Sequence, residues 1–332
     1  MVEVIKQSSI TPLRISFAGG GTDIPKFYLR HGPGATLSMA INRYVFTDLI
    51  RHFNSDMFSI SYKDVHKDVR NVDDIPHRAA REALKYKNIA GGLQVNISTE
   101  IPSEGTGLAA SSAFTVGMLN VLGHWQGRDP SPKELAEEAY HVEREILNEA
   151  GGKQDQYIAA YGGMKFIRYN KDGTIEVQDV ELKTDAREEM IKHFLLLYTG
   201  IRHKSGVILE KQTNGIVDHI EDYTKMARGA DQLRSRFMKE DWRGIAEVIN
   251  EGWELKKRLE GSISNPEIEH AIRIGKENGA LAAKVLGSGG GGCILFVATP
   301  DDHERIKKAV GMQQIQFDYE RRGSFCKRLV RG

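Results

Sequence analysis

The sequence predicts a two-domain protein in which strands and helices are mixed. Its 332 residues are enough for about two domains of ordinary size. Short runs of alternating apolar residues predict strands, and longer runs with apolar residues three or four apart predict helices. Forty per cent of the residues are hydrophobic, which supplies a packed core and excludes wholesale disorder. We place the domain boundary in a charged stretch, with an N-terminal domain over 1–185 and a C-terminal domain over 186–332.

Charge and cysteine content narrow the class of protein. Lys and Arg number 46 against 45 Asp and Glu, and this balance argues against a protein that coats nucleic acid. The two cysteines, Cys293 and Cys326, form no C-x-x-C pair, which is typical of a reducing compartment. The chain shows no signal-peptide pattern and no apolar run of membrane-spanning length. We therefore expect a cytoplasmic monomer or homodimer that binds neither nucleic acid nor membrane.

The segment 101–114 combines a glycine-bearing turn with a pair of serines and opens a helix. Alternating residues over 93–99 predict a half-buried strand before it, and apolar residues on one face predict the helix after it. That face comprises Phe114, Met118, Val121, Leu122 and Trp125. Glycines let the backbone approach a ligand, and the free N–H groups of a first helical turn favour phosphate. The segment therefore predicts an anion site.

Two other interpretations of this segment stay open on the residues alone. An ordinary strand-to-helix connection would also use glycine and serine, with Ser111 or Ser112 as the helix cap. The spacing of Gly105, Gly107 and Ala110 also fits a dinucleotide-binding fingerprint. The alternating strand and Pro102 speak against that second interpretation, because a parallel dinucleotide-binding strand is apolar throughout.

The first glycine turn along the chain follows the first predicted strand, and the turn within 101–114 is the second. Leu13, Ile15 and Phe17 alternate with polar or small residues, so Arg14 lies on the opposite face of the strand. The strand ends in the run 19–23, three glycines followed by Thr and Asp. Here a carboxylate could face a ligand, although Asp23 could equally cap an ordinary turn.

Polar residues also gather between two predicted helices. Ser131-Pro132-Lys133-Glu134 is a capping box that begins a helix, whose apolar face comprises Leu135, Ala139, Val142 and Ile146. Glu143 lies at the edge of that face, where a glutamate is usually a solvated flank. The polar run 153–157 is bracketed by glycines, and Asp155 is either a general base there or a helix cap.

A third glycine run lies between two apolar strands. Residues 282–286 and 293–297 predict a hairpin, and its loop, 287–292, contains five glycines. Such a loop favours close approach to another segment or a ligand over a flexible surface turn. A strand follows the loop, so its G-x-G-x-x-G spacing is not a dinucleotide-binding turn.

Together these regions resemble the three motifs of the small-molecule kinases named for galactokinase, homoserine kinase, mevalonate kinase and phosphomevalonate kinase. Residues 11–23 are similar to the first motif, 102–113 to the ATP-phosphate motif P-x-x-x-G-L-x-x-S-S-A, and 284–293 to the third. Gly-Lys-Gln-Asp-Gln-Tyr over 152–157 and Ser-Asn-Pro-Glu-Ile over 264–268 further resemble the D-glycero-D-manno-heptose 7-phosphate kinases. Fucokinases share the first motif.

The resemblance implies an α+β fold with two domains. The first would be a ribosomal-protein-like domain with a left-handed crossover, and the second a ferredoxin-like domain. It also implies an ATP- and Mg²⁺-dependent kinase that phosphorylates the anomeric hydroxyl of heptose 7-phosphate, for nucleotide-activated heptose. Two alternatives are another anomeric sugar kinase, of the fucose or galactose type, and a non-catalytic sugar and nucleotide sensor on the same fold.

Residue roles follow from the resemblance, position by position. ATP would bind at Pro102, Gly105, Gly107, Leu108, Ala110, Ser111 and Ser112. Ser112 and Glu143 would hold Mg²⁺, and Asp155 would act at the acceptor hydroxyl beside Arg14. The sugar would contact Gly21, Thr22, Asp23, Gly289 and Gly290. Arg202 and Lys204 could bind the acceptor's own phosphate, although a solvated basic loop is equally consistent. Ala109 departs from the glycine of many relatives, so the shape of this loop stays open.

Overall fold

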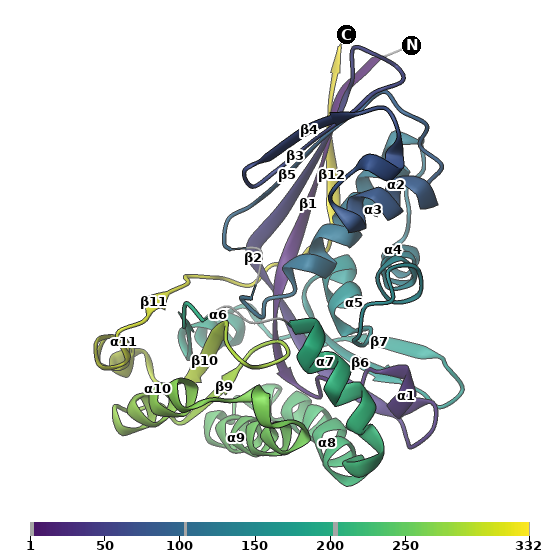
Figure 1. Cartoon of the computed structure of the whole chain (residues 1–332). Helices are drawn as coiled ribbons and strands as arrows, with labels where there is room; N and C mark the ends of the chain where they lie inside the picture. Colours follow the sequence, from purple (N-terminus) through teal and green to yellow (C-terminus); the bar gives the residue numbers. More distant parts are fainter. Residues whose placement is uncertain (1–2, 103–104, 202–204, 332) are drawn as a thin grey trace.

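The structure, a computed structural model, describes residues 3–102, 105–201 and 205–331 (Figure 1). Within these residues, eight strands form one sheet in the order β12-β1-β2-β5-β3-β4, and β6 and β7 extend it beside β2. The strands are β1 (Glu3–Ala18), β2 (Gly34–Arg51), β3 (Phe58–Tyr62), β4 (Val65–Val69), β5 (Leu93–Thr99), β6 (Met164–Tyr169), β7 (Ile175–Asp179) and β12 (Phe325–Arg331). The predicted strands over 13–17 and 93–99 are thus confirmed.

The long strand β2 pairs with different partners along its length. Its residues 45–51 pair with β5, and its residues 34–39 pair with β6. A shift of register in the β1–β2 pair lies between Pro12 and Leu13, and bulges of this kind bend a strand. Only β3 and β5 run parallel among the described pairs of this sheet, and α2 lies on the crossover between them.

Helices cover the sheet in the N-terminal half. They are α1 (Pro25–Tyr28), α2 (Arg78–Tyr86), α3 (Ala110–Trp125), α4 (Pro132–Tyr140) and α5 (Gln154–Tyr161). α3 packs against β1, β2 and the neighbouring helices α2, α4 and α5 (Figure 1). Its residues are buried almost all round, so the predicted single apolar face was too narrow. Gly117 allows the contact with β1, because a Cβ there would lie 2.6 Å from Thr11 Oγ1.

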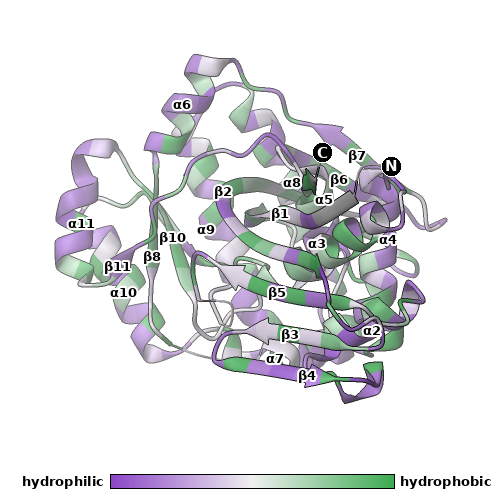
Figure 2. Cartoon of the chain, turned by 90° about the horizontal axis from the view of Figure 1, so that it is seen from above, coloured by the Kyte–Doolittle hydropathy of each residue, from purple (hydrophilic) through white to green (hydrophobic). Residues whose placement is uncertain are grey.

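A second, antiparallel sheet has the order β11-β8-β10-β9. Its strands are β8 (Phe194–Tyr198), β9 (Ala282–Val285), β10 (Cys293–Val297) and β11 (Gln313–Gln314). This strand order is that of a split β-α-β unit, as the ferredoxin-like prediction requires. β9 and β10 form the predicted hairpin. Figure 2 shows β10 as largely hydrophobic and the outer helix α11 (His303–Val310) as largely hydrophilic.

The other helices of this half are α6 (Thr184–Lys192), α7 (Ser205–Asn214), α8 (Ile220–Phe237), α9 (Trp242–Leu259) and α10 (Pro266–Glu277). Short 3-10 turns span Val72–Asp74, Gly215–Asp218, Gly261–Ile263 and Pro300–Asp302. α8 contacts β1 and β2, and α9 contacts β1 and β9. None of the described helices combines the length and the apolar composition that crossing a bilayer requires. The domain boundary near residue 185 stays a prediction. The last strand, β12, pairs with β1 in the first sheet.

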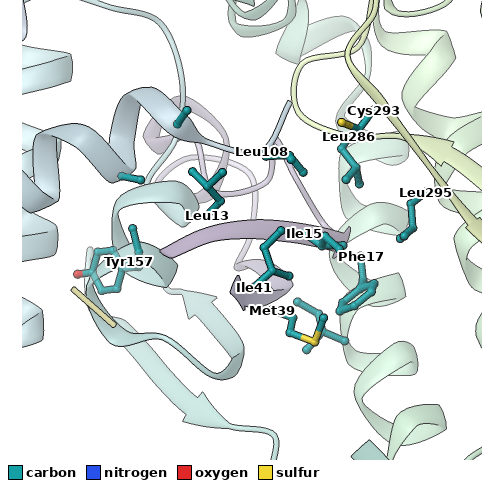
Figure 3. Packing of buried hydrophobic residues seen from close by; sticks show 14 of the residues in the cluster. Leu13, Ile15, Phe17, Met39, Ile41, Leu108, Tyr157, Leu286, Cys293 and Leu295 are labelled. Carbon is teal, nitrogen blue, oxygen red and sulfur yellow. The ribbon is translucent and has the colours of Figure 1, made fainter. Parts of the chain in front are cut away.

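One hydrophobic core joins the two sheets. The ring of Phe17, at the end of β1, lies 5.1 Å from the rings of both Phe194 and Phe237. Figure 3 shows Leu13, Ile15 and Phe17 along β1, with Leu286, which follows β9, and Cys293 and Leu295 of β10 beside them. The end of β1, which carries the first glycine turn, is therefore held against the segment that carries the third.

Candidate active site

Arg14 and Asp155 form a two-pronged ion pair between β1 and the first turn of α5. Arg14 Nε donates to Asp155 Oδ1 at 2.8 Å and Nη2 donates to Oδ2 at 2.9 Å. The third nitrogen, Nη1, donates to the carbonyl oxygen of Gly107 at 2.6 Å. The arginine side chain is 3% exposed, whereas the aspartate is 25% exposed. The pair therefore fixes the direction of a carboxylate that still faces open space. Within the described residues, the N-cap of α5 is Lys153 and no side-chain cap bond forms there.

Glu143 is buried among hydrogen-bond donors. It lies in a π-helical turn, His141–Ile146, and is 1% exposed. Ser112 Oγ donates to its Oε2 at 2.9 Å and Thr115 Oγ1 donates to its Oε1 at 2.7 Å, and Gln156 donates to Oε2 as well. The interpretation of Glu143 as a solvated flank was therefore wrong. A π turn shifts the helical register, and such turns are frequent at functional sites.

The helix that begins after the second glycine turn has no serine cap. Its N-cap is Ala109, at φ 65° and ψ 32°, without a side-chain cap bond. Ser112 instead faces Glu143, so the interpretation of the serines as caps was wrong. Ala109 adopts the left-handed conformation that a glycine would adopt, at a cost of about 1–2 kcal/mol. The alanine at this position therefore adopts a backbone conformation that glycine favours.

The first glycine turn is tied to α5 through Asp23. Asp23 is 4% exposed, and its two oxygens accept from the backbone N–H groups of Gly21 at 2.8 Å and Gln154 at 2.9 Å. Burial raises the pKa of its carboxyl, and the nearby charge of Asp155 adds to this. Thr22 is buried and donates to the carbonyl oxygens of Gly19 and Ala35. The local-cap interpretation of Asp23 is confirmed, and the side chain also lines a cavity.

The second and third glycine runs lie against each other. A Cβ on Gly107, at φ +74°, would lie 2.3 Å from the carbonyl oxygen of Leu286, and a Cβ on Gly287 would lie 2.6 Å from Gly107 Cα. Cys293 N donates to the carbonyl oxygen of Thr106 at 2.9 Å. The close approach predicted for the third run is therefore confirmed.

Two cavities meet at Asp155. The first lies between the first glycine turn, α8 and α9, and encloses about 950 Å³ with the space open to solvent. The second lies over residues 105–112 and reaches Glu143 and the start of α7. Arg14, Arg144 and Asp155 line both.

The predicted binding residues divide between these cavities and the surrounding packing. Gly21 and Asp23 line the first cavity, and the second is lined by Gly105, Gly107, Ala110, Ser111 and Ser112. Pro102, Leu108, Thr22, Gly289 and Gly290 line neither cavity as the described residues define them. A Cβ on Gly289 would lie 2.6 Å from the carbonyl oxygen of Ile263, and Gly290 N donates to the same oxygen. Arg202 and Lys204 lie outside the described residues.

Two buried lysines beside the first cavity were not predicted. Lys284 Nζ donates to the carbonyl oxygens of Ser16 at 2.9 Å and Phe17 at 2.8 Å, and burial lowers its pKa far below the usual range. Lys256 Nζ donates to the carbonyl oxygen of Gly287. Burial lowers the pKa of Lys256 to about 8, and the charge of Arg14 adds to this. No local pattern in α9 marks Lys256, because a lysine in the last turn of a helix is ordinarily exposed.

The depressed pKa of Lys256 predicts a pH dependence of stability. Between pH 8 and 10.5 the unfolded chain binds more protons at this lysine than the folded chain, so its contribution to stability is complete above about 10.5 and is lost as pH falls through about 8. Lys256→Met removes this titration. The free energy of unfolding of the variant minus that of the wild type should therefore fall as pH rises from 8 to 10. Urea unfolding measures it, with the exposed Lys276 changed to Met as the control. A constant difference would contradict the shift.

The oxygen donors near the second cavity suit a magnesium ion. Ser112 supplies a hydroxyl and Glu143 a carboxylate, and the two are already in contact. No three His, Cys, Asp or Glu side chains of the described residues come together as a metal-ligand group. Mg²⁺ accepts such a sparse set, because it commonly keeps waters and substrate phosphates as its other ligands.

Comparison with known proteins agrees with this arrangement. Residues 74–163 match the family described as GHMP kinases N terminal domain, and residues 233–313 match GHMP kinases C terminal. The chain is 26% identical to the D-glycero-alpha-D-manno-heptose 7-phosphate kinase of Campylobacter jejuni, over 92% of this chain and 93% of that one. It is also 26% identical to the L-fucokinase/L-fucose-1-P guanylyltransferase of Bacteroides fragilis, over 90% of this chain and 35% of that one.

A solved structure shares the fold over almost the whole length. The D-glycero-D-manno-heptose 1-phosphate kinase of Bacteroides thetaiotaomicron superposes with a TM-score of 0.80 and 24% identity, and the match covers 97% of this chain and 99% of that one. Three findings lead to one conclusion. They are the matches to the family in both halves of the chain, the two-domain α+β fold and the three glycine runs. The chain belongs to the GHMP kinases, phosphotransferases that use a hydroxyl group as the acceptor.

Proposed function

We propose that this kinase uses ATP and Mg²⁺ to phosphorylate the anomeric hydroxyl of D-glycero-D-manno-heptose 7-phosphate. The observation that carries the chemistry is the carboxylate of Asp155, held by two hydrogen bonds from Arg14 where the two cavities meet. The observation that supports the acceptor is the similarity to a heptose 7-phosphate kinase over 92% of the chain. The product would be the 1,7-bisphosphate, which serves as a precursor of nucleotide-activated heptose.

The triphosphate is proposed to lie in the second cavity. Residues 105–107 and 109–112 line it, and the last of these lie in the first turn of α3. The free N–H groups of a first helical turn favour phosphate oxygens. Ser112 and Glu143 would hold Mg²⁺, which offsets phosphate charge when bound. Phosphoryl transfer requires positioning and neutralisation of charge more than covalent chemistry. The side chains in the second cavity suit both requirements.

The sugar is proposed to lie in the first cavity with its anomeric hydroxyl at Asp155. That carboxylate would accept the hydroxyl proton as the oxygen attacks phosphorus. An anomeric hydroxyl is more acidic than an ordinary alcohol, so a carboxylate suffices as the base. Arg14 keeps the carboxylate oriented and compensates for phosphate charge nearby. Gly21 and Asp23 would face the sugar hydroxyls, because each carboxylate oxygen of Asp23 accepts one backbone bond and keeps a further lone pair.

A panel of acceptors tests the proposal. Purified protein is incubated with Mg·ATP and heptose 7-phosphate, mannose, fucose or galactose, and ADP release is followed. We expect turnover with the phosphorylated heptose, and a ³¹P NMR signal from a second phosphate, coupled to the anomeric proton. Turnover with fucose instead would favour the second candidate, a fucokinase-like enzyme, which the Bacteroides fragilis relative suggests. ATP binding without turnover of any acceptor would contradict the proposed substrate and favour a sensor.

A further inference from the structure

Arg144 is the third charged side chain that lines both cavities. It follows Glu143 in the π-helical turn, and its side chain is 13% exposed. The other two, Arg14 and Asp155, form the ion pair already described. No part of the sequence pattern marked Arg144 as functional, because a charged residue beside a predicted solvated flank is usually solvated as well.

The guanidinium of Arg144 has hydrogen-bonding capacity to spare. Nη2 lies 3.5 Å from Glu143 Oε2 and Nη1 lies 3.8 Å from Glu149 Oε2, distances of ion pairs rather than of good hydrogen bonds. The buried Nε has no hydrogen-bond partner among the described residues. All three nitrogens of Arg14, by contrast, donate at 2.6–2.9 Å. A buried donor without a partner in a native structure requires an explanation. The two Nη atoms, which are at ion-pair distance only, keep donors for a bound anion.

The absence of a side chain at Gly151 leaves room for this guanidinium. It adopts φ +141°, and a Cβ there would lie 2.9 Å from Arg144 Nη2 and 3.0 Å from Cζ. Any side chain at position 151 would push the guanidinium away from the place where the cavities meet. The chain therefore has a glycine where the arginine needs room.

We propose that Arg144 is a second catalytic cation, which binds oxygens of the phosphoryl group as it passes from the nucleotide to the acceptor. This rests on the proposed kinase reaction and on Asp155 as its base. In that step the bond from phosphorus to the bridging oxygen of ADP breaks and its electron pair leaves with ADP. The acceptor oxygen forms the new bond to phosphorus and its proton goes to Asp155. Arg144 stays protonated, and its donors bind charge on the transferring oxygens.

The position of Arg144 distinguishes this role from two others. A side chain that reads the acceptor's own phosphate would line the first cavity alone. One that binds the ribose or the α-phosphate would line the second alone. Arg144 lines both, and the transferred phosphoryl group is the part of the substrates that belongs to both.

Binding of two nucleotides tests the proposal without any sugar. Calorimetry gives the Kd of Mg·ADP and of Mg·AMP-PNP, an ATP analogue that is not hydrolysed, for the wild type and for Arg144→Gln. We expect the variant to bind AMP-PNP about 10-fold or more weakly, as loss of a charge-assisted hydrogen bond implies, and to bind ADP within about twofold of the wild type. Gly151→Ala should produce the same selective loss. The kcat of Arg144→Gln should fall by about 10³-fold, and Arg144→Lys should recover part of it.

Arg168→Gln is the matched control. Arg168 is likewise paired with a carboxylate, that of Asp231, but lines neither cavity, so the affinities for ADP and AMP-PNP should both stay at wild-type values. The proposal would be overturned if Arg144→Gln lost affinity for ADP and for AMP-PNP equally, or lost affinity for neither. If the wild type fails to phosphorylate the heptose, the substrate assignment fails, and the ratio of the two affinities still decides the role of Arg144.

Discussion

Replacing Asp155 with Asn should lower kcat by about 10²–10⁴-fold, the range for loss of a general base, while the Kd for Mg·ATP changes little. The amide keeps the shape of the side chain but cannot take the acceptor's proton. It also accepts through one oxygen, so one prong of the Arg14 pair is lost and a cation that is 3% exposed is left without its counter-charge. The fold should lose about 1–3 kcal/mol. Steady-state kinetics, calorimetry with ATP and urea unfolding measure these three effects.

Asp185 supplies the matched control for this variant. Both aspartates lie in the first turn of a helix, Asp155 in α5 and Asp185 in α6. Asp185→Asn therefore removes the same favourable interaction with a helix N-terminus, worth a few tenths of a kcal/mol at the surface. We expect it to keep the wild-type rate. An Asp155→Asn protein that keeps more than a few per cent of the rate would show that Asp155 is not the base.

Gly107→Ala should impair both stability and ATP binding. The new Cβ would lie 2.3 Å from the carbonyl oxygen of Leu286, and position 107 has φ +74°. The second and third glycine loops must then separate, and Arg14 loses its acceptor on Gly107. We expect a loss of more than about 2 kcal/mol in the free energy of unfolding and a fall of about 10²-fold in kcat/KM, since small displacements near reacting groups have effects of that size.

Gly127→Ala separates conformational strain from the clash. Gly127 has φ +77°, nearly the value of Gly107, and a Cβ there would meet no atom within 4 Å. This variant should therefore lose only about 1 kcal/mol, the cost of a left-handed alanine, and keep its activity. If the two variants lost similar amounts of unfolding free energy, the packing of the two glycine loops would contribute nothing to stability.

The parts of the fold that were predicted correctly depend on local pattern. Alternation of apolar and polar residues identified the strand that carries Arg14. A four-residue capping box identified the start of α4, where the side chains of Ser131 and Glu134 each accept a hydrogen bond from the other's backbone N–H. Five glycines within six residues identified a loop in close contact. Each signal lies within about ten residues of chain, so no knowledge of the other segments was needed.

The parts that were missed depend on contacts between distant segments. Ile146 was placed on the buried face of a regular helix, but the π turn rotates it outward and it is 40% exposed. The same turn brings Glu143 inward. Lys256 is buried and donates to the third glycine loop, at the carbonyl oxygen of Gly287. These side chains have ordinary sequence surroundings, and their burial is decided by segments far away in the chain.

The pairing of β12 with β1 has a consequence for synthesis on the ribosome. Ile10 pairs with Phe325, so the strand that carries Arg14 emerges long before its neighbour on that side exists. At about 5–20 residues per second the wait is roughly 15–60 s. During that interval the nascent chain presents the edge of β1 without its final partner, and open strand edges invite intermolecular association. Until translation reaches residue 325, pairing with β2 covers only the opposite edge of β1, so the edge that β12 will occupy stays open.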